Sequence, residues 1–172
     1  MSMLAALTVS IGVLAVVATW LFLGPLAAFQ AQVWQAFIAW ACFYHSGGKL
    51  AGVRAAAIGM SFGAVVGVAS VLLAQQLGAL GELAAPIAVG IGASVIVLAS
   101  KIPVLSTIPA SVYGFAAVAG LILLGGEGMT ATKALVPTIV SIVIGTAFGY
   151  VSEALAGALT KKAAAPVGDA AG

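Results

Sequence analysis

Six apolar segments, separated by short polar or Gly/Pro-containing breaks, dominate the pattern of the chain. Their approximate bounds are 4–23, 33–45, 53–74, 83–99, 109–124 and 135–159. A helix that crosses a bilayer needs about 20 apolar residues, so the second, fourth and fifth segments are short for a full crossing. The pattern predicts an all-α, polytopic transmembrane bundle of about six helices. Residues 1–160 would form one domain, and the Ala/Gly/Pro-rich residues 161–172 a disordered cytoplasmic tail.

The cations provide a second test of six crossings. Five of the six would fall on one side of the membrane, and only Lys133 on the other. The five are Lys49, Arg54, Lys101, Lys161 and Lys162. Because Lys and Arg gather on the cytoplasmic side, both termini are expected in the cytoplasm. Five crossings with one half-inserted segment is the alternative.

Composition agrees with a membrane protein and excludes several classes of function. Apolar residues make up 63% of the chain and charged residues 6%, whereas soluble domains carry about a quarter charged residues. The lipid bilayer is therefore the expected partner. The scattered cations, net charge +2, predict no nucleic-acid binding. With a single cysteine, Cys42, and no acid–base pair or phosphate loop, we expect no metal, no cofactor and no enzyme.

The two halves of the chain resemble each other weakly. The second segment ends at Gly47-Gly48 and the fifth at Gly125-Gly126. Phe62-Gly63 in the third segment matches Phe148-Gly149 in the sixth. Because three helices are an odd number, a second copy would be upside down, which gives a three-plus-three inverted repeat of the kind common in transporters. Chance matches are the alternative, since Gly and Ala are abundant.

Glycines at every fourth residue form flat faces on two segments. They are Gly59, Gly63 and Gly67 in the third, and Gly145 and Gly149 in the sixth. Another backbone can approach such a face closely. We expect these faces to pack helices or to make an oligomer contact.

Two prolines flank a cluster of hydroxyl groups before and within the fifth segment. Pro103 and Pro109 interrupt helical hydrogen bonding, and Ser106, Thr107 and Ser111 could face a solute. This composition is typical of a pore helix or a broken helix. The alternative is an ordinary loop followed by a helix that begins with Pro.

Other side chains have a functional and a structural interpretation. The aromatic residues Phe37, Trp40 and Phe115, with Tyr113, could line and narrow a path, or could pack against lipid and neighbouring helices. His45 could gate a pore, or could anchor a helix end. Glu153 lies within the sixth segment and is a functional candidate, unless it reaches the interface.

The second segment from Trp34 to Gly48, together with residues 108–114, resembles a family of bacterial inner-membrane proteins labelled domain of unknown function 1097. That resemblance implies the inner membrane and no established activity. A fainter resemblance is to one half of a urea transporter, whose pore signature is Leu-Pro-x-x-Thr-x-Pro-Phe. Residues 102–106 match its first part, residues 107–109 match the second after a one-residue shift, and Ala110 replaces the Phe. It implies a pore helix in an oligomeric channel.

The function that these patterns favour is a passive channel or facilitator for a small neutral polar solute, such as urea, an amide or a dissolved gas. Its path would be lined by Ser106, Thr107, Pro109, Ser111 and Tyr113 and narrowed by Phe37, Trp40 or Phe115. No charge lies near the middle of a segment, which argues against ion-coupled transport. The alternative is a non-transporting membrane subunit or scaffold that packs a partner through its glycine faces. A homo-oligomer is expected because the unit is small.

Overall fold

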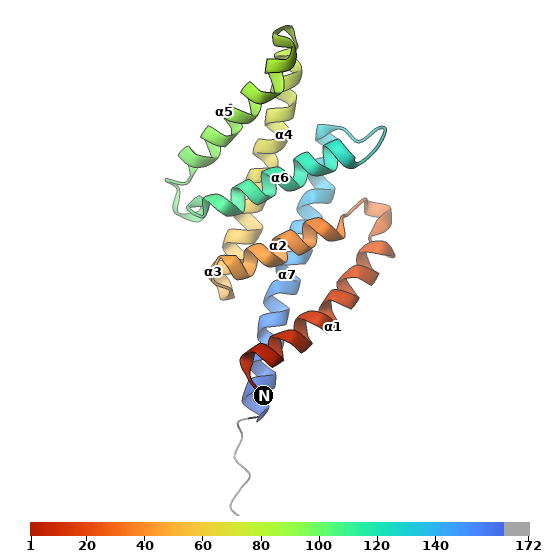
Figure 1. Ribbon diagram of the computed structural model, residues 1–172, viewed down its shortest axis with the longest axis vertical. Helices are drawn as coiled ribbons and strands as arrows, with labels where there is room; N and C mark the ends of the chain where they lie inside the picture. Colours follow the sequence, from red (N-terminus) through yellow and green to blue (C-terminus); the bar gives the residue numbers. More distant parts are fainter. Residues whose placement is uncertain (164–172) are drawn as a thin grey trace, which may run out of the picture.

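Six helices of 13 to 33 residues account for most of the described chain (Figure 1). The computed structural model describes residues 1–163, with side chains through residue 160. The six helices are α1 (Met3–Leu23), α2 (Val33–His45), α4 (Met60–Gln76), α5 (Ala84–Ala99), α6 (Ile108–Leu124) and α7 (Ala131–Ala163). The helical bundle is therefore confirmed, with six helices close to the six predicted segments. The helix α7 begins earlier than predicted and continues through residue 163, into the predicted tail; residues 164–172 lie outside the described residues.

Five short elements join or extend these helices. They are η1 (Ala27–Phe29), α3 (Lys49–Arg54), η2 (Ala55–Gly59), η3 (Gly78–Leu83) and η4 (Pro103–Leu105). The elements α3, η2 and α4 run as one continuous apolar helix, Lys49–Gln76. Four helices of the described chain are long and apolar enough to cross a membrane: α1, the Lys49–Gln76 helix, α5 with η3, and α7.

The helices α2 and α6 are shorter and lie across the middle of the molecule (Figure 1). Helix α2 has 13 residues, which at 1.5 Å per residue is about 20 Å, less than the roughly 30 Å of a bilayer core. Helix α6 has 17 residues. These two helices pack against α7 and α4 respectively.

The two halves of the chain interlock rather than stand side by side. In the first half α1 and α2 both pack on α7, and in the second half α5 and α6 both pack on α4. Figure 1 shows that α4 and α7 run in opposite directions. The outer helices also use matching positions, because Ala6 and Ser10 are buried in α1 and Ala88 and Gly92 in α5. These contacts are those of a three-plus-three inverted repeat.

Close contacts at the glycines, with partner backbone atoms at Gly63 and Gly145 and with partner side chains at Gly67 and Gly149, set the register between the halves. Four contacts form two matching pairs: Gly63 with Ser111 and Gly145 with Ala36, then Gly67 with Val118 and Gly149 with Phe43. Gly63 therefore corresponds to Gly145, not to Gly149. The sequence match through the preceding phenylalanines was wrong by one helical turn, because the close backbone approach, and not the phenylalanine, fixes the register.

A sharp turn joins α2 to α3. Gly47 and Gly48 have φ angles of 91° and 65°, which only glycine adopts without strain. The Glu153 carboxylate on α7 accepts a hydrogen bond of 2.7 Å from the backbone N–H of Lys49. A negative charge at the first turn of a helix is favourable, so Glu153 holds the start of the Lys49–Gln76 helix against α7.

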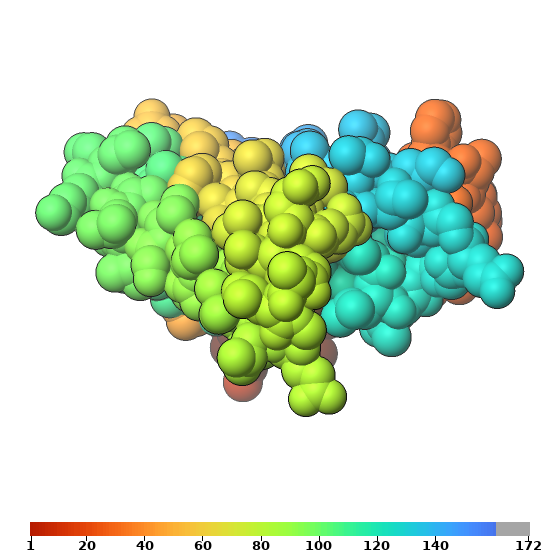
Figure 2. Space-filling model, turned by 90° about the horizontal axis from the view of Figure 1, so that it is seen from above, coloured from red at the N-terminus to blue at the C-terminus, as the bar shows by residue number. Residues whose placement is uncertain are grey.

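The outer surface is apolar, as lipid requires. On α1, Leu4, Val16 and Leu23 are 77%, 71% and 72% exposed. Viewed from above, the α4–α5 hairpin lies on one side of the molecule and the α6–α7 connection on the other (Figure 2). A soluble protein would not leave so many large apolar side chains in water.

Candidate functional site

Helical hydrogen bonding is interrupted at corresponding positions in the two halves. The segment η2 between α3 and α4 is π-helical and begins at Ala55. When the halves are aligned through Gly63 and Gly145, Ala55 corresponds to Pro137. Pro137 lies inside α7. A π-bulge and an internal proline both disturb the regular i to i−4 ladder. Such breaks are frequent at functional sites, and paired breaks are found at the binding sites of inverted-repeat transporters.

The break at η2 borders an open cleft of about 510 Å³. The residues that line it come from the end of α2, from α3 and η2, and from the segment before α6: Ser46, Ala51, Arg54, Ala55, Ile58, Pro103, Val104, Ser106 and Thr107. Arg54 is the charged member of this lining, and three members carry hydroxyl groups. The cleft therefore offers hydrogen-bond donors and acceptors to a polar molecule.

The Pro-flanked segment is not a pore helix. It forms the short 3₁₀ turn η4, followed at Ile108 by α6, with Pro109 in the first turn. The Ser106 hydroxyl donates to the Pro103 carbonyl over 2.9 Å. The loop with a Pro-started helix is therefore the correct alternative, since Pro at the first turn loses no helical hydrogen bond. Ser106 and Thr107 still line the cleft.

A buried amide lies beside the second break. Gln35 of α2 is completely buried, and its Nε2 donates to the Ala117 carbonyl of α6 and to Thr138 Oγ1 of α7, each over 2.9 Å. Its Oε1 has no hydrogen-bond partner. Leaving a buried acceptor unpaired costs about 1–3 kcal/mol. Gln35 thus places a free acceptor between the two halves of the protein.

Hydroxyl groups next to Pro137 complete this cluster. The Ser141 hydroxyl donates to the Pro137 carbonyl over 2.8 Å and accepts the backbone N–H of Gln32 over 2.9 Å. Thr138 and Ser141 are both fully buried. Sequence reasoning missed Gln35, Thr138 and Ser141. A signal existed, because a proline inside an apolar segment is followed within one turn by two hydroxyl side chains.

Two other predicted path residues lie apart from the cleft. Ser111 is 1% exposed, its backbone packs on Gly63, and its hydroxyl has no partner. Tyr113 lines a separate cavity of about 360 Å³ with His45, and the two rings meet edge to face at 5.9 Å. His45 therefore borders this cavity and not the cleft at η2.

The aromatic residues do not converge on one constriction. Trp40 is 5% exposed, stacks on Phe148 at 5.6 Å, and donates from Nε1 to Ser152 Oγ over 3.0 Å. Phe37 is 38% exposed on the surface, and Phe115 packs beside Gly67 and Gly92. Trp40 and Phe115 therefore pack between helices, and Phe37 lies on the outer surface.

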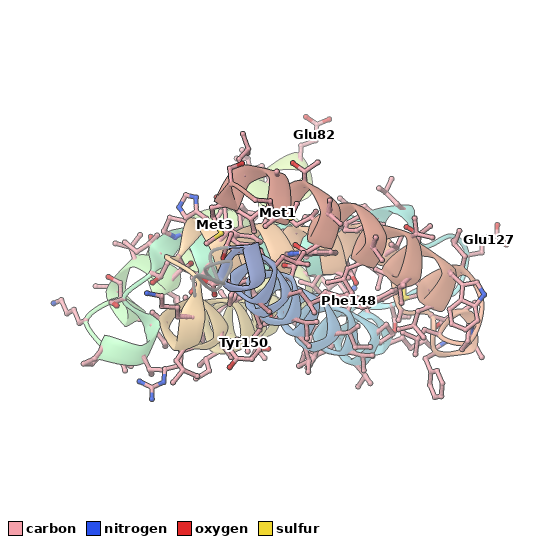
Figure 3. All side chains as sticks on the ribbon, turned by 90° about the horizontal axis from the view of Figure 1, so that it is seen from below. Met1, Met3, Glu82, Glu127, Phe148 and Tyr150 are labelled. Carbon is pink, nitrogen blue, oxygen red and sulfur yellow. The ribbon has the colours of Figure 1, made fainter. Side chains whose placement is uncertain are left out.

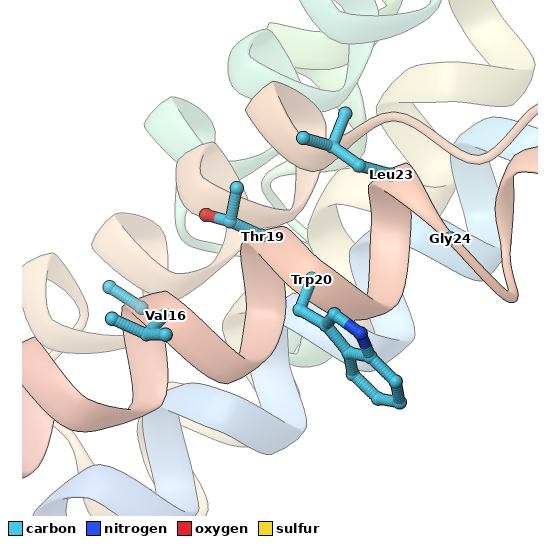
Figure 4. A pocket seen from close by; sticks show the side chains of 6 residues that line it. Val16, Thr19, Trp20, Leu23 and Gly24 are labelled. Atoms are coloured by element: carbon cyan, nitrogen blue, oxygen red, sulfur yellow. The ribbon is translucent and has the colours of Figure 1, made fainter.

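A shallow groove of about 660 Å³ lies on α1 (Figure 4). Val16, Trp20 and Leu23 border it, and Trp20 is 64% exposed. Thr19 provides its one hydroxyl group. The groove lies on the outer, apolar face of α1, where lipid is the expected neighbour.

Among the described residues, no acidic side chain lines the cleft or bonds to Gln35. Figure 3 shows Glu82 and Glu127 projecting from the periphery, and Glu153 binds the Lys49 N–H. Within the described residues, no group of three or more His, Cys, Asp or Glu side chains is arranged to hold a metal. The chemistry on offer is therefore hydrogen bonding by amide, hydroxyl and guanidinium groups.

Comparison with known proteins gives one match. The sequence model of the family described as "Protein of unknown function (DUF1097)" matches residues 8–157, most of the chain. No curated protein and no solved structure matches. The resemblance to a urea transporter is therefore not shown.

Proposed function

The chain belongs to the DUF1097 family of proteins of unknown function, and from the geometry of its two halves we propose that it is a facilitator for a small neutral polar solute. The observation that carries this proposal is the pair of corresponding helix breaks, at Ala55–Gly59 and at Pro137. Each break lies beside polar side chains within an otherwise apolar bundle, which is where inverted-repeat transporters bind their solutes.

The charge distribution supports a neutral solute and passive movement. The helices α1, α2, α4, α5 and α6 contain no Asp, Glu, Lys or Arg. Lys49 and Arg54 are the first and last residues of α3, Lys133 lies in the first turn of α7, and Glu153 of α7 accepts the Lys49 N–H. Ion-coupled and proton-coupled transporters normally hold an ionisable group within the membrane. Arg54 in the cleft repels cations. Urea and amides remain the preferred solutes, because both donate and accept hydrogen bonds.

Several wider features belong to the same proposal. The protein works in the inner membrane with both termini in the cytoplasm, as a homo-oligomer and without cofactor or enzymatic activity. The positions of Lys49, Arg54 and Lys101 support this orientation through the excess of cations on cytoplasmic segments.

Stopped-flow swelling of proteoliposomes tests the proposal. Vesicles that contain the protein should take up at least one of urea, formamide, acetamide or glycerol faster than empty vesicles. Thr107→Val removes a hydroxyl from the cleft and should slow that uptake about fivefold, the effect of losing one hydrogen bond of about 1 kcal/mol.

Thr19→Val is the matched control, because Thr19 borders the lipid-facing groove on α1 and not the cleft. It should leave uptake unchanged. Equal swelling of protein-containing and empty vesicles across all four solutes would refute the facilitator. An equal effect of the two substitutions would refute the path through the cleft.

The alternative, a scaffold that binds a partner through glycine faces, loses its main support. Gly59, Gly63 and Gly67 pack against α6, and Gly145 and Gly149 pack against α2. Both faces are therefore covered within one chain and are not free for a partner helix.

A further inference from the structure

The open cleft at η2 has a closed counterpart in the other half. In the glycine register, Ile58 of the cleft corresponds to Val140 of α7, and η4 corresponds to η1. Ile58 is 42% exposed in the cleft. Val140 instead packs against a cluster formed by Phe22, Ala31 and Ala36. Equivalent side chains therefore border a cavity in one half and fill the space in the other.

The segments before α6 and α2 show the same difference. Ser106 is exposed in the cleft, whereas its counterpart before α2, Ala31, is 5% exposed. The next residue, Gln32, is tied to Ser141 of α7 through its backbone N–H. Its counterpart Thr107 lies in the open cleft. The segment before α6 thus borders an open cleft. The equivalent segment before α2 is closed by apolar packing and by the Gln32–Ser141 hydrogen bond.

Polar contacts of Gln35 lie one helical turn below this closed segment. Gln35 lies in the first turn of α2, three residues after the N-cap Gln32, and binds Thr138, the residue after Pro137. Its second bond, to the Ala117 carbonyl, ties α2 to α6. The counterparts of Gln35 and Thr138 below the open cleft are Ala110 and Ala56, which cannot form such bonds. The two ends therefore differ in the bonds that hold them closed.

We propose that Ala31, Gln32, Gln35, Thr138 and Val140 form a second solute mouth, closed in this structure, and that the two halves exchange conformations so that one mouth is open at a time. In the exchanged state the cleft at Ser106 and Thr107 closes while the mouth at Ala31 opens. Inverted repeats make such an exchange favourable, because each half can adopt the conformation of the other.

The unpaired Oε1 of Gln35 indicates which class of solute the second mouth would bind. An acceptor in an apolar interior is satisfied by a solute that donates N–H or O–H, and it gains nothing from a molecule without a donor. The second mouth is therefore suited to amides, ureas and alcohols, and not to apolar dissolved gases. This assignment of solute class rests on the proposed function; the exchange of mouths does not.

Cysteine accessibility in nanodiscs, where both faces meet the solvent, tests the exchange. The single cysteines Ser106→Cys and Ala31→Cys are placed in a Cys42→Ala background, because Cys42 is the one native thiol of the chain. A polar maleimide should modify Ser106→Cys faster than Ala31→Cys. Adding Gln35→Ala breaks two bonds of the closed mouth, and should speed modification at Ala31→Cys by about tenfold. It should slow modification at Ser106→Cys.

The decisive result is that Gln35→Ala speeds modification at Ala31→Cys and slows modification at Ser106→Cys. Faster reaction at Ala31→Cys without slower reaction at Ser106→Cys would overturn the exchange, as would no change at either position. Thr138→Val removes a single bond of the same cluster with little change in volume, so it should give the same signs with a smaller effect even if Gln35→Ala weakens folding.

The experiment separates this inference from the proposed function, because it needs no solute. Opposite changes in accessibility with no swelling would retain the two mouths and reject the tested solutes. Swelling with both cysteines reactive in the same state would retain the facilitator and reject the exchange in favour of a continuous channel.

Discussion

At the scale of single residues, glycines let the helices of this bundle approach one another closely. Gly63 and Gly114 of neighbouring helices α4 and α6 lie against backbone atoms of Ser111 and Met60. Gly145 lies in the same way against Ala36. Lipid tails are as apolar as the side chains, so membrane helices associate through close packing rather than through exclusion of water. These glycines allow that packing.

Adding one methyl group should therefore have opposite effects at two glycines. Gly145→Ala places a Cβ on the Ala36 backbone and should lower the free energy of unfolding by about 1–3 kcal/mol. Gly90→Ala in α5 places it in open space and should raise that free energy by up to about 1 kcal/mol, since Ala favours the helix. Unfolding in mixed micelles measures both, and a similar response at the two positions would contradict the packing.

At the scale of elements, the short helices α2 and α6 depend on the breaks in their long neighbours. Ser141 follows Pro137 and accepts the N–H of Gln32 just before α2. The π-helix η2 brings Gly59 against Ala110 in the first turn of α6. Each break thus receives the N-terminal end of a short helix. Broken helical backbone is tolerated within a membrane protein where it is buried against protein or lines a cavity.

Pro137→Ala should strengthen α7 and slow transport. Pro137 is in the second turn of α7, where its ring excludes a hydrogen bond to the Lys133 carbonyl. Restoring that bond should raise the free energy of unfolding by about 1–3 kcal/mol. Uptake by proteoliposomes should fall, because the restored hydrogen bond would remove the break in α7 beside Gln35 and Thr138.

Pro86→Ala provides the comparison, because Pro86 is in the first turn of α5, where a proline removes no helical hydrogen bond. It should change neither stability nor uptake. A Pro137→Ala protein with unchanged stability would mean that the N–H introduced at this position does not bond to the Lys133 carbonyl.

The sequence predicted the helices far better than the site. Long apolar runs end at Gly, Pro or charged residues, and this pattern located α2 to the residue. The π-helix at Ala55–Gly59 has no such signal, because Ala and Gly are as common in regular membrane helices. Gln35 was missed because a single amide in an apolar segment has no periodicity. Its importance depends on Ala117 and Thr138, which are distant in sequence.

At the scale of the whole molecule, interlocking halves explain how so small a chain can hold a polar interior. Each outer helix packs on the third helix of the other half, α1 on α7 and α5 on α4. Neither half could therefore bury its own polar groups alone. Gln35 belongs to the first half, and both of its hydrogen-bond partners belong to the second. The polar site exists only where the halves meet.

The inverted arrangement requires that α6 crosses the membrane, although it has only 17 residues. Lys101 and Lys133 are exposed residues before and after this helix, so they should lie on opposite faces. In a Cys42→Ala background, an impermeant maleimide should label Lys133→Cys on intact cells and Lys101→Cys only after permeabilisation. Labelling of both from one face would mean that α6 turns back within the membrane. The chain would then have an odd number of crossings, and the two halves could not exchange conformations.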